Sequence, residues 1–155
     1  MDGVTKFKKM TEHYKTMLEK GLEFQDFICE ALLKEMGINL TMFSSRKYQL
    51  SKGENIQGLE IKFDDIYKKT GNVYIEIAEK SNEENENYIS SGIYRNDNTW
   101  LYLIGNYEEV FIFPKNILVL LDNKKRYKYV QTPTSKGFLI NKEDAHKFCA
   151  KKIIF

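Results

Sequence analysis

The sequence predicts an α+β fold, in which one or two N-terminal helices precede a mixed, largely antiparallel central sheet and a short C-terminal helix. Three observations predict this class: a long N-terminal stretch of helical periodicity, several runs of alternating apolar and polar residues, and a helix-capping asparagine near the end. The 155 residues have the size of one domain with its own core. We therefore expect a single domain over residues 1–155.

The N-terminal segment has the periodicity of an amphipathic helix. Apolar residues recur every three or four positions between Thr5 and Met36. Gly21 either divides this segment into two helices or is tolerated inside one. Gly37 follows directly, and glycine is a common residue at helix C-termini, so the helix is expected to end at Met36.

The middle of the chain is typical of β-strands. Residues 57–64 and 72–80 alternate between apolar and polar side chains, as strands with one buried face do. Further strands are expected at residues 47–50, 99–104, 110–113, 127–131 and 137–140, whereas residues 117–121 suit a strand or a short helix. Trp100 is expected in the core. Asn141 predicts the start of the C-terminal helix, with Glu143 and Asp144 in its first turn.

A hairpin is predicted where Lys69-Thr70-Gly71 separates the first two strands. Three-residue hairpin loops usually end with a glycine in the left-handed conformation, which fits Gly71. Pairing outward from this loop places three pairs on the polar face: Asp64 opposite Glu76, Lys62 opposite Ala78, and Glu60 opposite Lys80.

Two facing carboxylates disfavour each other unless a cation lies between them. Mg²⁺ and Mn²⁺ prefer carboxylate oxygens, and a lysine beside the ion can stabilise the charge that develops on a phosphate. The hairpin therefore predicts a metal site at Asp64 and Glu76 with a neighbouring lysine. An ordinary solvated sheet face carries the same residue types, and this alternative stays open.

The runs GENIQGLEIKFD and TGNVYIEIAEK together resemble the core of the PD-(D/E)XK nuclease-like superfamily, particularly its small phage and prophage members. The resemblance covers residues 23–80. It implies a restriction-endonuclease-like fold and Mg²⁺-dependent hydrolysis of phosphodiester bonds in DNA. Asp64 matches the strand aspartate and Glu76 the glutamate of the E-x-K motif, but Ala78 stands where the motif has its lysine.

The missing lysine leaves two assignments of the motif open. In the first, Lys62 fills the vacant position across from Ala78, and Lys80 is a second catalytic candidate. In the second, the literal E-x-K is Glu60-Ile61-Lys62, which makes Glu60 a metal ligand and Glu54 its partner acid. Glu23 or Glu30 of the N-terminal helix could serve as an accessory acid, although a solvated helix face explains them equally.

A basic run near the C-terminus is the second candidate for nucleic-acid contact. Lys124, Lys125, Arg126 and Lys128 are expected to contact phosphates, and the tyrosines among and beside them to stack on bases. Alternatively, this basic run is a solvated turn without a binding role. The net charge of +2 neither requires nor excludes a nucleic-acid partner.

Composition narrows the remaining classes. The two cysteines, Cys29 and Cys149, offer neither a metal spacing nor a disulfide framework, so reduced thiols in a cytoplasmic protein are expected. The polar N-terminus argues against a signal peptide, and the longest apolar run is too short to cross a membrane.

The expected function is that of a metal-dependent nuclease acting on DNA. The alternative is a non-catalytic binding module on the same fold, such as a phage protein that engages DNA or a host defence complex. A homodimer is left open.

Overall fold

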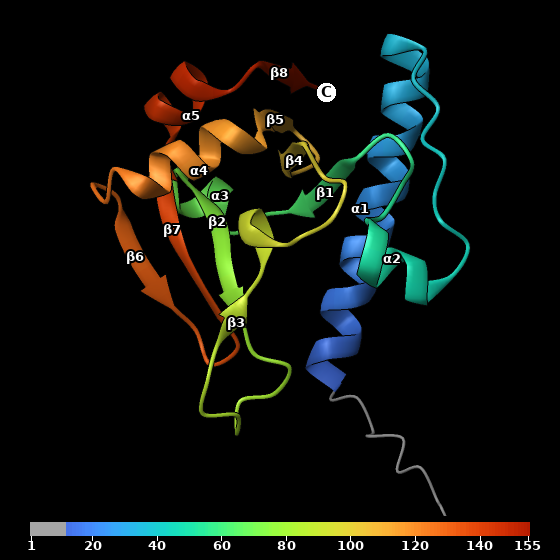
Figure 1. Cartoon of the computed structure of the whole chain (residues 1–155). Helices are drawn as coiled ribbons and strands as arrows, with labels where there is room; N and C mark the ends of the chain where they lie inside the picture. Colours follow the sequence, from blue (N-terminus) through green and yellow to red (C-terminus); the bar gives the residue numbers. More distant parts are fainter. Residues whose placement is uncertain (1–11) are drawn as a thin grey trace, which may run out of the picture.

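The N-terminal helix is one continuous element. The computed structural model describes residues 12–155 (Figure 1), so residues 5–11 of the predicted helix lie outside the described part. The helix α1 (Glu12–Met36) runs through Gly21 without a break. It ends as predicted, and Gly37 follows with a φ of 66°.

The strands of residues 12–155 form two sheets, where a single central sheet was expected. Sheet 1 has the order β1-β4-β5-β8 and sheet 2 the order β3-β2-β7-β6. Among the strand pairings of residues 12–155, only β1–β4 is parallel, so the predicted mixed, largely antiparallel character is confirmed. The strands are β1 (Leu59–Phe63), β2 (Asn72–Glu79), β3 (Ile89–Ser90), β4 (Leu101–Gly105), β5 (Glu109–Pro114), β6 (Lys128–Gln131), β7 (Ser135–Asn141) and β8 (Lys151–Ile154).

The shorter helices connect these strands. They are α2 (Arg46–Lys52), α3 (Tyr67–Thr70), the 3₁₀ turn η1 (Gly92–Tyr94), α4 (Lys115–Asn123) and α5 (Lys142–Phe148). The Asn141 side chain accepts a hydrogen bond from the Asp144 backbone N–H at 2.8 Å, which confirms the predicted cap of α5. The strand predicted over residues 47–50 is wrong because that segment is helical, and residues 117–121 lie in a helix.

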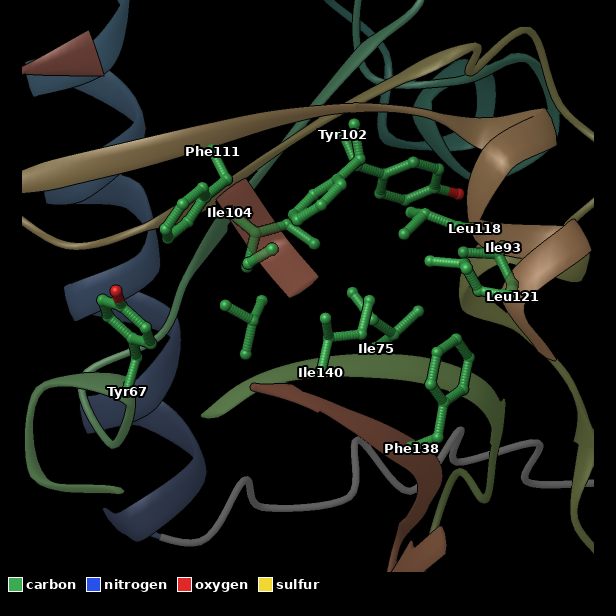
Figure 2. Packing of buried hydrophobic residues seen from close by; sticks show 13 residues of the cluster. Tyr67, Ile75, Ile93, Tyr102, Ile104, Phe111, Leu118, Leu121, Phe138 and Ile140 are labelled. Carbon is green, nitrogen blue, oxygen red and sulfur yellow. The ribbon is translucent and has the colours of Figure 1, made fainter. Parts of the chain in front are cut away.

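Sheet 1 is the middle of three layers. Its residues Leu103, Val110 and Ile112 pack toward α1, against a cluster that includes Phe24 and Ile28. The alternate residues of β4 and β5 pack toward sheet 2. Figure 2 shows this second cluster, in which Tyr102, Ile104 and Phe111 lie across from Ile75, Phe138 and Ile140. Sheet 2 therefore uses one face for the core.

The predicted hairpin register is wrong, because β1 and β2 do not pair with each other. Residues 67–70 form the helical turn α3 instead of a hairpin loop, and this turn carries the chain away to the second sheet. Gly71 has the expected left-handed conformation, with a φ of 68°, but it caps α3. In the ladders that do form, Glu60 lies beside Tyr102 and Glu76 beside Gly137.

Two smaller findings complete the fold. Trp100 is 58% exposed, so its predicted place in the core is wrong; its indole N–H donates to the Gln57 carbonyl at 2.7 Å. Within residues 12–155, no helix has both the length and the apolar character needed to span a membrane.

Candidate functional site

A cavity of about 620 Å³ lies where β1 ends beside β2. β3 pairs only with the last residues of β2, so the first part of β2 has no strand of residues 12–155 along this edge. The cavity starts between this edge and β1 and continues across sheet 2 to β6. Its walls are mainly apolar, but Lys62, Asp64 and Glu76 all line it. Three predicted site residues therefore share one cavity, although the pairing that suggested it does not exist.

Asp64 ties the end of β1 to the edge of β2. Its Oδ1 accepts from the Tyr67 backbone N–H at 2.9 Å, and its Oδ2 accepts from the Tyr74 backbone N–H at 3.0 Å. Burial raises the pKa of Asp64, while these two N–H groups act in the opposite direction. With both oxygens engaged by the backbone, Asp64 has a structural role that sequence reasoning missed.

Glu76 is held by two serine hydroxyls. Ser91 donates to one carboxylate oxygen and Ser135 to the other, each at 3.0 Å. The Ser135 hydroxyl also lies 2.5 Å from the Tyr74 hydroxyl. Neither serine was predicted, because they lie far from Glu76 in the sequence and only the β2–β7 pairing and the turn before η1 bring them to it. The network fixes the Glu76 carboxylate at the cavity wall.

Glu60 and Lys62 form an ion pair on one side of β1. The Lys62 ammonium lies 2.7 Å from Glu60 Oε1; the Glu60 side chain is 2% exposed and that of Lys62 44%. Burial lowers the pKa of Lys62, but the carboxylates of Glu60 and Glu76 outweigh this effect and raise it. Among residues 12–155, Glu60 Oε2 has no hydrogen-bond partner. A buried carboxylate oxygen without a donor is costly, and a bound cation would relieve that cost.

Glu54 is the second acid near this pair. Burial, followed by repulsion from Glu60, raises the pKa of Glu54 to about 7. The loop that carries it is well fixed, because the Asn55 side chain hydrogen-bonds both the N–H and the carbonyl of Leu59, at 3.0 and 2.6 Å. Acids with strongly raised pKa values are enriched at functional sites. The Glu60–Lys62 ion pair and the raised pKa of Glu54 agree with the second assignment of the motif, but of its three residues only Lys62 lines the cavity.

Glu60 and Glu54 could supply only part of the coordination shell of a divalent cation. In the described part of the chain, no three His, Cys, Asp or Glu side chains lie close enough together to form a metal-binding group. Mg²⁺ is commonly held by only one or two carboxylates, with water and substrate phosphates as its other ligands. The unpartnered oxygen of Glu60 and the neighbouring acid Glu54 are suited to such a site.

The other predicted acids and the second lysine lie elsewhere. Lys80 does not line the cavity; its ammonium sits 4.5 Å from the centroid of the Tyr88 ring. Glu23 and Glu30 are exposed on α1, and Glu30 lies 3.7 Å from Lys34. Both helical glutamates therefore match the alternative interpretation, in which they lie on a solvated face of the helix.

The basic run Lys124–Lys128 is exposed at its four basic residues. The two tyrosines of this segment form hydrogen bonds within the protein: Tyr127 donates to Asp144 at 2.7 Å, and Tyr129 donates to the Asp122 carboxylate. Both rings also pack against Phe138. Lys128 lines the cavity, so the run extends from solvent to the candidate site.

Comparisons with protein-family models, with curated proteins and with solved structures find no match for this chain. The fold and the site geometry are therefore the basis for any assignment of function.

Proposed function

We propose that this protein is a cytoplasmic, metal-dependent nuclease-like protein that hydrolyses phosphodiester bonds in DNA. The observation that carries the proposal is the Glu60–Lys62 pair, in which a buried carboxylate, with one oxygen unpartnered among residues 12–155, holds a half-exposed lysine at the wall of a cavity. Both thiols are free, which agrees with a reducing compartment.

Each residue has a distinct part in this proposal. Glu60 and Glu54 hold Mg²⁺ or Mn²⁺. The ion, when bound, polarises the phosphate and lowers the pKa of a water molecule. Lys62 faces the cavity and stabilises the negative charge that develops on the phosphate. The charge of Glu76 favours the protonated form of Lys62, and Asp64 fixes the end of β1 that carries it.

The test is cleavage of labelled single-stranded and duplex DNA with Mg²⁺ or Mn²⁺. Glu60→Gln should remove nearly all cleavage, because it takes away a metal ligand. Lys62→Ala should lower the rate by about 10²–10³, the usual effect of losing one electrostatic stabiliser. Lys151→Ala, an exposed lysine on β8, is the matched control and should cut like wild type. Full activity in folded Glu60→Gln would contradict the site.

A non-catalytic binding module is the second candidate. It is favoured by Asp64 and Glu76, whose carboxylate oxygens all accept hydrogen bonds from the protein's own donors. On this account the same cavity engages DNA, or a component of a host defence complex, without cutting. Wild-type protein that binds DNA but cleaves none with either metal would select this candidate.

A further inference from the structure

The Tyr74 ring lies against the open face of sheet 2. A Cβ built on Gly137 would come within 2.4 Å of Tyr74 Cε2 and 2.6 Å of its Cζ, so the ring occupies the space that a side chain at Gly137 would fill. Gly137 belongs to the neighbouring strand β7. The tyrosine hydroxyl reaches one step further, to Ser135 at 2.5 Å. Both ends of the side chain are thereby fixed to the sheet.

This face is the one that the core does not use. Ile75, Phe138 and Ile140 point into the cluster between the two sheets (Figure 2), and side chains alternate along a strand. Tyr74 and Leu139 therefore point the other way, and both line the cavity. Lys128 and Val130 of β6 extend the same lining, and Met17 of α1 contributes from the helix side.

We infer that Tyr74 is a stacking platform for an unpaired nucleobase, and that the cavity takes single-stranded nucleic acid. The inference rests on the proposed function and names its substrate class. A ring fixed on a sheet face, among apolar side chains, offers its free side to a base, and sheet-face aromatics bind single strands in this way. Asp64, Asp65 and Glu76 also line the cavity, but near β1, whereas Lys128 places a positive charge at the β6 end, beside Tyr74's face of the sheet, where it can contact a backbone phosphate.

The geometry selects a single strand over a duplex. In a duplex both faces of each base are covered by stacked neighbours, so a base has to leave the stack before an aromatic ring can contact it. The cavity of about 620 Å³ also reaches between the sheets, where Ile75, Tyr102 and Ile104 line it, and its size is in the range of sites that enclose small molecules, which suits an unstacked nucleotide.

The experiment measures binding without metal. Fluorescence anisotropy is recorded in EDTA with a labelled thymidine oligomer and with a duplex of the same length. Wild type should bind the single strand more tightly. Tyr74→Leu should weaken that binding about tenfold or more, as expected for loss of one stacked base. Tyr74→Phe keeps the ring and removes the hydroxyl, and should stay within about threefold of wild type.

Further variants keep the test decisive. Tyr74→Met fills the same space with a flexible apolar chain and replaces Tyr74→Leu should the latter not fold. Lys128→Ala should lower the salt dependence of binding by about 0.7 in log–log slope, whereas Lys151→Ala should leave it unchanged.

Equal affinity of folded Tyr74→Leu and wild type for the single strand would overturn the inference, as would equal binding of duplex. If single-strand binding depends on Tyr74 but no DNA is cleaved with any metal, the stacking role of Tyr74 is supported and the proposed nuclease activity is contradicted.

Discussion

At the scale of single residues, Asp122 links three parts of the fold. This carboxylate on α4 has a 3% exposed side chain and accepts hydrogen bonds from the hydroxyls of Tyr94 and Tyr129. Lys125 donates to it at 3.2 Å. Burial alone would raise the pKa of Asp122, but these donors outweigh burial and lower it. The carboxylate thus joins α4 to η1 and to β6.

Asp122→Asn should destabilise the protein by about 2–4 kcal/mol, because it removes the charge that these donors stabilise and adds an amide N–H facing hydroxyl groups. Urea unfolding followed by far-UV circular dichroism measures the change. Glu35→Gln, on the exposed face of α1, is the control and should change stability by less than about 0.5 kcal/mol.

Glu109 predicts how stability depends on acid. Burial opposes its charge, but the Tyr67 hydroxyl and the Lys152 ammonium, at 2.6 and 3.0 Å, lower the pKa of Glu109 from its ordinary 4.5 to about 2. Because the folded-state pKa is the lower one, this stabilisation is complete above pH 4.5 and is lost as the pH falls toward 2. A shift of that size corresponds to roughly 3 kcal/mol.

Wild type should therefore be more stable than Glu109→Gln at pH 7, and the difference should shrink as the pH falls below 4.5. Urea midpoints at pH 7 and near pH 2.5 give the comparison. Glu108→Gln disrupts only an exposed pair with Lys68, and should show no comparable narrowing. A difference that stays constant with pH would contradict the assigned role of Glu109.

The candidate site was only partly predictable from single residues. Glu60 and Lys62 alternate with apolar neighbours, which suggested an exposed face, yet Glu60 is 1% exposed because β1 is covered on both sides. An alternating pattern shows which side chains are polar, but not which elements pack against each face of the strand. The prediction that Trp100 is buried failed for the opposite reason. Its apolar neighbours in the sequence suggested burial, but they do not reveal the Gln57 carbonyl that holds its indole at the surface.

At the scale of elements, periodicity located the strands well and their partners poorly. The alternation in residues 57–64 and 72–80 predicted β1 and β2, because it is a local property of the chain. The hairpin inference depended on Lys69-Thr70-Gly71 alone. Asp64, by accepting from the Tyr67 N–H, instead starts a helical turn there, and long-range packing then decides the pairing. β8, with its two lysines, lacked a recognisable pattern.

Replacement by alanine should change the stability of the protein in opposite directions at two glycines, Gly21 and Gly71. Within residues 12–155, a Cβ added at Gly21 or at Gly71 would meet nothing within 4 Å beyond the adjacent backbone, so steric clashes do not distinguish the two positions. Gly21→Ala should stabilise by about 0.5–1 kcal/mol, because Gly21 lies inside α1. Gly71→Ala should destabilise by about 1–2 kcal/mol, because its φ of 68° is left-handed. Thermal unfolding of both variants measures these effects, and changes of the same sign would contradict them.

At the scale of the whole molecule, a ligand that binds only the folded state stabilises all of it. Mg²⁺ or Mn²⁺ at a hundred times its dissociation constant should add about 2.7 kcal/mol, which raises Tm by roughly 5–10 °C. EDTA should reverse the shift. Glu60→Gln should abolish it, whereas Glu79→Gln, an exposed acid on β2, should retain it. A shift that survives Glu60→Gln would move the metal to another site.

The parallel pairing of β1 with β4 also bears on how the chain folds as it is made. Leu59 lies beside Leu101, so a loop of about 40 residues closes before β1 has its strand partner. During synthesis α1 and β1 are made before β4 and β5, which carry apolar residues that cover them. The nascent N-terminal half therefore exposes the apolar side chains of Phe24 and Ile28 for several seconds of synthesis, a period in which chaperones bind.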